Sequence, residues 1–307
     1  MATPNVEGGH ELQDGGAARD TLVAIRRLAK YYVRGDQVIP VLTDINLDVA
    51  DGDLVETALR PSRQGFSRLE FVGDAVLGLA VATTLHRRGE PPARLPDLVN
   101  NDRLDEIYRG SDLARLAPRC SGDVIEALIG AIHLSAGFDA GATAALALVA
   151  PENEWEPPVA DGRPGGELVI GGDGGPLVPP NGVRALAFVG ATLLSCAAAD
   201  HAVATLPGMP HRALAQHRVQ LISPRRVLGL ASVRSVVPGA ADAGEEHGYD
   251  LVQARAAAVF LAYGWAATKP WVADLLAFSS VPAARVPPRR RRTAGGARPA
   301  RRGGRGQ

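Results

Sequence analysis

Cysteine and lysine are almost absent from this chain of 307 residues. The two cysteines, Cys120 and Cys196, form neither a disulfide framework nor a Cys-x-x-Cys metal pattern, so we expect both to be reduced and half-buried. Lysine occurs only at positions 30 and 269, which leaves arginine to carry almost all the positive charge. Aromatic residues make up only 5% of the chain. These scarcities exclude a small disulfide-stapled domain and favour helices that pack through alanine and glycine.

A secretion signal and a long apolar run are also missing from the sequence. The polar start of the chain lacks the charged and apolar regions of a signal peptide. The longest apolar run, at about residues 185–199, ends at Asp200 and is shorter than the roughly 18–20 residues that span a membrane. We therefore expect a soluble, cytoplasmic protein with no membrane partner.

The formal net charge is zero, but the charge is unevenly distributed. Residues 285–307 carry nine arginines and no acid, whereas residues 1–284 carry 24 basic and 33 acidic residues, a net charge of −9. The Arg- and Gly-rich composition of the C-terminal segment predicts a disordered basic tail. Such a tail binds phosphate backbones without sequence choice. A purely solubilising role is the alternative.

Two stretches place pairs of acidic residues among apolar ones. In Ser-Arg-Leu-Glu-Phe-Val-Gly-Asp-Ala-Val-Leu, Glu70 and Asp74 are four apart, which puts both carboxylates on one face of a helix. In Gly-Asp-Val-Ile-Glu-Ala-Leu-Ile-Gly-Ala-Ile, Asp123 and Glu126 are three apart. Because buried like charges destabilise a helix, we expect a cation between them. Four carboxylates from two buried helices suit a hard divalent cation such as Mg²⁺, and solvated acidic faces are the alternative.

The first of these stretches resembles the signature helix of ribonuclease III, and the second resembles that family's other acidic helix. The resemblance implies that Glu70, Asp74, Asp123 and Glu126 are the family's four catalytic, metal-site carboxylates. Glu70, Asp123 and Glu126 would hold Mg²⁺, or Mn²⁺ in its place, with Asp74 beside them. The resemblance also implies hydrolysis of double-stranded or structured RNA that leaves 5′-phosphate and 3′-hydroxyl ends. Domains of this family work in side-by-side pairs, so the partner is either a second half of the same chain or a second copy.

The chain departs from the family's pattern between the two acidic helices. Asp74 and Asp123 are only 49 positions apart, which is short for the family, and the segment before the second helix is trimmed to residues 116–121. Between them, we expect Asn100 or Asn101 to cap a helix rather than to contact RNA.

Residues 21–55 alternate between apolar and polar residues, which predicts short strands with a turn at Asp51-Gly52. This segment resembles the opening strands of ATP-binding cassette ATPases, with Tyr31 or Tyr32 at the position that stacks on adenine. No Gly-x-x-x-x-Gly-Lys-Ser/Thr loop follows, so nothing is expected to cradle a phosphate. We therefore predict a grafted or remnant β-hairpin rather than ATP binding.

Beyond a linker at residues 151–180, rich in Pro, Gly, Glu and Asp, the chain repeats itself weakly. Residues 186–194 align with 69–77 at an offset of 117, and residues 250–265 align with 123–138 at an offset of 127. The equivalents of Glu70, Asp74, Asp123 and Glu126 are Ala187, Ala191, Asp250 and Gln253. One carboxylate cannot hold a catalytic metal, so we expect a degenerate second domain. A chance likeness of two Ala-rich helices is the alternative.

The sequence therefore predicts a mainly α fold with two ribonuclease III-like helical domains in tandem. The predicted parts are a disordered segment (1–20), a β-rich ATP-binding-cassette-like fragment (21–55), a catalytic domain (56–150), a linker (151–180), a degenerate domain (181–284) and the basic tail (285–307). The predicted function is Mg²⁺-dependent endoribonuclease activity in RNA processing. The alternatives are a non-catalytic RNA-binding or assembly factor with the same fold, and an ATP-binding-cassette fragment or fusion product without a settled activity.

Overall fold

The structure, a computed structural model, describes most of the chain. The described residues are 23–34, 37–49, 52–111, 113–116, 121–157, 182–233, 237, 240 and 243–278, with only the backbone described in the first two ranges. The predicted disordered segment 1–20, the tail 285–307 and most of the linker 151–180 lie outside these residues. We call residues 52–157 the first half and residues 182–278 the second half.

Helices dominate the described residues, which confirms the predicted mainly α fold. The first half contains α1 (Gly52–Ala58), α2 (Phe66–Arg87), the 3₁₀ turn η1 (Pro92–Arg94), α3 (Leu95–Val99), α4 (Asn101–Gly110), α5 (Leu113–Leu116), α6 (Asp123–Ala136) and α7 (Phe138–Val149). The second half contains α8 (Val183–Thr205), α9 (His211–Leu221), α10 (Pro224–Val233) and α11 (Glu245–Leu275). Asn100 caps α4, as predicted, because its side-chain oxygen accepts a hydrogen bond from the backbone N–H of Arg103 at 2.8 Å.

The N-terminal segment forms an antiparallel hairpin of β1 (Val23–Arg34) and β2 (Gln37–Val49). The prediction of strand structure beyond the Asp-Gly turn is wrong, because Gly52–Val55 opens helix α1. Asp53 lies in the first turn of α1, where a carboxylate favours the positive end of the helix dipole, and Thr57 donates a side-chain hydrogen bond back to the carbonyl of Asp53. The likeness to ATP-binding cassette strands stays a prediction.

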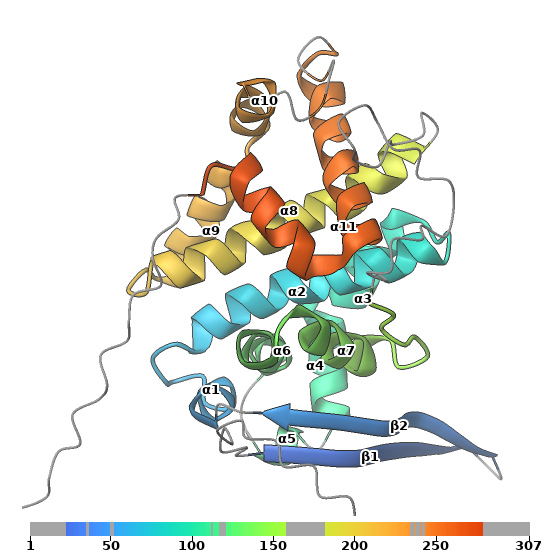
Figure 1. Cartoon of the computed structure of the whole chain (residues 1–307). Coiled ribbons are helices and arrows are strands. Elements are labelled where there is room, and N and C mark those ends of the chain that lie inside the picture. The colour runs from blue at the N-terminus through green and yellow to red at the C-terminus, as the bar shows by residue number, and fades with distance from the viewer. Residues whose placement is uncertain are drawn as a thin grey trace, which may run out of the picture.

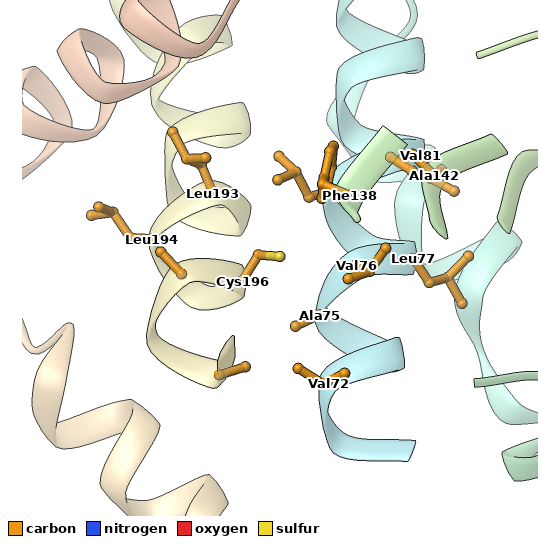
Figure 2. Close-up of a cluster of buried hydrophobic side chains, with 14 of the residues drawn as sticks. Val72, Ala75, Val76, Leu77, Val81, Phe138, Ala142, Leu193, Leu194 and Cys196 are labelled. Carbon is orange, nitrogen blue, oxygen red and sulfur yellow. The ribbon is translucent and has the colours of Figure 1, made fainter. Parts of the chain in front are cut away.

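Two long apolar helices, α2 and α8, lie side by side at the centre of the molecule (Figure 1). Figure 2 shows Val72 and Ala75 of α2 on the side that faces Cys196 of α8, whereas Leu77 points away from α8. Helices α6 and α7 pack on α2, and α9 and α11 pack on α8. Cys196 is fully buried in this interface rather than half-buried, and Cys120 lies outside the described residues.

By length and composition, α2 and α8 could each cross a membrane, contrary to the expectation that no apolar run is long enough. However, 72% of the apolar window in α2 and 67% of that in α8 are buried inside the protein. The core helices of a soluble protein have the same character, so burial in the core accounts for the apolarity of both helices.

The helix pair α6 and α7 has a counterpart within α11. Gly137 separates α6 from α7 with φ 92° and ψ 177°. Gly264, 127 positions further on, breaks the helical conformation inside α11 with φ 75° and ψ 177°. Because a positive φ is readily adopted only by glycine, the same backbone break is specified at the same place in both halves.

Equivalent residues of the two halves also meet each other. Phe138, directly after the first break, stacks on Trp265, directly after the second, with ring centroids 4.7 Å apart and an interplanar angle of 21°. Phe138 and Trp265 are repeat equivalents, and the equivalent helices α2 and α8 are in contact as well, as expected of two halves that pack around an approximate two-fold axis. The predicted tandem domains and their boundaries stay a prediction.

A buried polar cluster joins the two halves. The carboxylate of Asp200 on α8 lies 3.4 Å from Nε2 of His133 on α6 and 2.5 Å from Nζ of Lys269 on α11. Burial alone would raise the pKa of Asp200, but the hydrogen bond from His133 and the charges of His133 and Lys269 lower it to about 2. Asp200 therefore stays ionised and holds three helices together.

Candidate metal centre

Helices α2 and α6 cross in direct backbone contact because glycine occupies both crossing positions. A Cβ atom at Gly73 would lie 1.7 Å from the carbonyl oxygen of Glu126, and one at Gly130 would lie 2.1 Å from the carbonyl oxygen of Leu69. This crossing brings the acidic face of α2 against the first turn of α6, which contains Asp123 and Glu126. The start of α6 is fixed separately by a hydrogen bond from the backbone N–H just before this turn to the Asp105 side chain on α4.

Three of the four predicted carboxylates gather at this crossing. Glu70, Asp123 and Glu126 each offer a carboxylate oxygen, and these atoms all lie within 4.8 Å of one another. Glu126 is only 8% exposed, whereas Glu70 and Asp123 are partly buried. A set of three closely spaced anionic oxygens can bind a hard divalent cation such as Mg²⁺.

Burial, together with the proximity of other acids, raises the pKa values of two members of this cluster. Burial, followed by the charges of Asp74, Glu70 and Asp123, raises the pKa of Glu126 to about 8. Burial, followed by the charges of Asp123 and Asp74, raises the pKa of Glu70 to about 7. Because neighbouring acids contribute to both shifts after burial, a cation bound at this cluster would be electrostatically favourable.

Asp74, the fourth predicted carboxylate, does not belong to this group. Its side chain is 50% exposed, so the expectation that all four acids are embedded in apolar residues is wrong here. Asp74 forms an ion pair with Arg218 of α9, whose Nη1 atom lies 3.2 Å from Oδ2 of Asp74. A cation thus accompanies Asp74, as like-charge repulsion predicts, but it comes from the second half of the chain.

The second half repeats the crossing without three of the four acids. A Cβ atom at Gly190 would lie 1.9 Å from the carbonyl oxygen of Gln253, as Gly73 meets Glu126 in the first half. Ala187 and Gln253 are both buried at the equivalents of Glu70 and Glu126. Within the described part of the chain, the first-half cluster is the only group of three or more metal-ligating side chains so close together.

Curated proteins named Ribonuclease 3 resemble this chain. The protein of Rhodopseudomonas palustris is 37% identical over 106 residues, which covers 27% of this chain and 39% of the relative. The protein of Nitrobacter winogradskyi is 37% identical over 109 residues, covering 28% and 41%, and that of Brucella canis is 35% identical over 117 residues, covering 31% and 48%. No family model matches the chain.

Part of this chain is related to ribonuclease III. The chain spans less than half the length of these curated relatives. The similarity to the Ribonuclease 3 of Rhodopseudomonas palustris extends over 106 residues but takes up only 27% of the 307 residues here, so the relative has residues in the matched region that this chain lacks.

Sequence reasoning missed Arg218 and the cluster of Asp200, His133 and Lys269. The Arg218–Asp74 pair joins residues 144 positions apart, and no local spacing predicts such a contact. His133 and Asp200 carried a weak signal, since each is a polar residue within an otherwise apolar helix. Such residues need partners when they are buried, but the sequence does not say which partner each one finds.

Proposed function

We propose that this protein is an endoribonuclease that hydrolyses phosphodiester bonds in double-stranded or structured RNA. The relationship to ribonuclease III supports the proposal. The observation that carries it is the convergence of Glu70, Asp123 and Glu126 at the crossing of the two acidic helices, with their carboxylate oxygens within 4.8 Å of one another.

These three carboxylates would hold Mg²⁺, or Mn²⁺ in its place. A metal bound here would make water nucleophilic near neutral pH and stabilise the charge on the leaving 3′ oxygen, giving 5′-phosphate and 3′-hydroxyl products. The rigid glycine crossing keeps the side chains on α2 and α6 in fixed relative positions, as a catalytic ligand set requires. Asp74 lies at the rim of the cluster and contributes negative charge without belonging to it.

A second candidate function is RNA binding or assembly without turnover. One observation favours it, namely that Asp74 is paired with an arginine instead of lying within the metal group. A cleavage assay and a binding assay on duplex RNA together separate the two functions, because a binding protein would retain RNA affinity without hydrolysing RNA.

The deciding experiment compares the wild-type protein with Glu126→Gln in a cleavage assay on duplex RNA with Mg²⁺. Removing one anionic ligand should lower the cleavage rate by about a hundredfold or more, since a metal supplies several kcal/mol of transition-state stabilisation. The thermal midpoint without metal should hold or rise, because Gln is neutral and does not need the proton that buried Glu126 takes up on folding.

Glu106→Gln is the matched control, since it makes the same chemical change on α4 at an exposed residue that pairs with Arg103. It should cleave RNA like the wild type. Undiminished cleavage by Glu126→Gln in Mg²⁺ would remove the metal-site assignment.

We further propose a cytoplasmic location. The burial of α2 and α8 within the helical core and the bacterial origin of the related ribonucleases support it. Fractionation of cells that express the full-length protein tests this, and recovery in the membrane pellet would contradict it.

A further inference from the structure

Helix α9 of the second half lies against the acidic helix of the first half. His211, at the start of α9, packs edge-on to Phe71 of α2, with ring centroids 5.7 Å apart. Near the other end of α9, the guanidinium of Arg218 lies over the same ring, 4.9 Å from its centroid. Residues near both ends of α9 therefore contact Phe71. The contact of Arg218 with this ring positions its guanidinium against α2.

A second contact fixes the chain just before α9. Arg68 of α2 donates hydrogen bonds to the carbonyl oxygens of Val203 and Leu206, at 2.5 and 2.6 Å. These carbonyls lie at the C-terminal end of α8, where the negative end of the helix dipole attracts a cation. Arg68, Phe71 and Asp74 recur every three residues along α2, so these contacts to the end of α8 and to α9 come from one side of this helix.

Arg218 is the basic side chain at the acidic site. Within the described part of the chain, no other arginine, lysine or histidine forms an ion pair with Glu70, Asp74, Asp123 or Glu126. Its side chain is 21% exposed, and the hydrogen bond to Asp74 uses only one of its terminal nitrogens. A guanidinium has five N–H donors in a planar fork that matches the oxygens of a phosphate.

We propose that Arg218 binds a phosphate of the RNA backbone beside the metal cluster, so that the second half of the chain supplies a substrate-binding residue to the site in the first half. This inference rests on the proposed function. The guanidinium donates a hydrogen bond to Asp74 and packs on the ring of Phe71, which together fix its orientation. Its remaining N–H donors would then bind the RNA phosphate. The second half, although it lacks three of the four acids, thereby completes the site.

The test uses the full-length protein and the variants Arg218→Gln, Arg218→Lys and Arg225→Gln. Arg225 is the matched control, because it lies in α10 of the same half with a side chain that is 90% exposed and its nearest carboxylate 3.9 Å away. Duplex RNA binding is measured in EDTA at several salt concentrations. We measure the slope of the logarithm of the binding constant against the logarithm of the salt concentration, which we call the salt slope. Loss of one phosphate contact should reduce the magnitude of this slope by about one for Arg218→Gln and leave it unchanged for Arg225→Gln.

Cleavage and metal binding complete the test. In Mg²⁺, we expect Arg218→Gln to lower the cleavage rate at saturating RNA at least about tenfold. Its Mn²⁺ affinity without RNA should be unchanged or higher, because a neighbouring positive charge has been removed. Arg218→Lys keeps the charge without the planar fork, so it should retain the salt slope and lose part of the cleavage rate. If circular dichroism shows that Arg218→Gln is unfolded, Arg218→Lys replaces it in the test.

The outcomes separate this inference from the proposed function. If the wild type cleaves RNA but Arg218→Gln matches Arg225→Gln in slope and rate, the role of Arg218 is refuted while the function stands. If the wild type binds duplex RNA without cleaving it, the proposed function fails, and the salt slopes alone decide the role of Arg218. If the wild type does not bind RNA, both are wrong.

Discussion

At the scale of single residues, the acidic cluster combines two opposing requirements. Its members must be close enough to share a cation, yet without one their charges repel and burial removes the water that would screen them. The raised pKa values of Glu70 and Glu126 are the result. At neutral pH without metal, these groups therefore hold protons that they would lose in the unfolded chain.

This protonation predicts how stability depends on pH. A carboxyl whose folded pKa, about 7 or 8, exceeds its unfolded value of 4.5 binds more protons in the folded state, so metal-free stability should fall as the pH rises from about 4.5 to 8. Each pKa unit corresponds to about 1.4 kcal/mol, and solvent screening at half-exposed Glu70 reduces its share, so we expect a total fall of a few kcal/mol. Urea unfolding between about pH 5 and 8.5 in EDTA measures it.

Added Mg²⁺ should oppose this fall, because the metal binds the deprotonated carboxylates and displaces their protons. Its apparent affinity should therefore increase with pH through the range of the two raised pKa values. Glu126→Gln removes the largest contributor and should flatten the pH dependence. A metal-free stability that stays constant over this range would show that the cluster does not hold these protons.

At the scale of helices, the sequence predicted the two acidic helices and the cap at Asn100, because each depends on residues within about one turn of each other. It did not predict α1, where an alternating pattern was interpreted as a strand although the segment has a helix-favouring first turn. Sequence patterns could not predict the ion pair of Arg218 with Asp74, because it depends on how the two halves of the chain pack against each other. Local patterns thus predicted the three acids that gather at the crossing of α2 and α6, but not the ion pair that the second half makes with Asp74.

The glycine crossings give a prediction at this scale. Gly73→Ala should destabilise the protein by roughly 3 kcal/mol or more, because its Cβ would overlap the Glu126 carbonyl and the α2 and α6 backbones would have to separate. Gly190→Ala should cost a similar amount at the second-half crossing. A Cβ atom added at Gly78 of α2 would meet nothing within 4 Å, so Gly78→Ala should be neutral or stabilising by up to about 1 kcal/mol.

Urea or thermal unfolding of the three variants checks this prediction. Gly78→Ala controls for the change in helix propensity, which all three share. If Gly73→Ala and Gly190→Ala unfolded like Gly78→Ala, the close crossings, and with them the structural argument for the repeat, would be wrong.

At the scale of the whole molecule, the two halves share a glycine crossing and a backbone break but differ in their acidic residues. The equivalent breaks at Gly137 and Gly264 and the stack of Phe138 on Trp265 are those expected of two halves around a two-fold axis. The face of α2 that carries Val72 and Ala75 is covered by α8 of the same chain (Figure 2). A second copy therefore cannot pack its own α2 there without displacing the second half.

This arrangement predicts that one chain has one active site and nicks duplex RNA. The second half has alanine or glutamine at three of its acidic positions, so it cannot hold the metal needed to cut the opposite strand. Light scattering should find a monomer, and a duplex labelled on both strands should give cut strands on a denaturing gel while most molecules stay full length on a native gel. Asp250→Asn should leave cleavage unchanged, since this remaining second-half acid lies outside the metal group. A homodimer that makes staggered double-strand cuts would instead mean that the active halves pair between chains, which requires α8 to leave the face of α2 that it covers here.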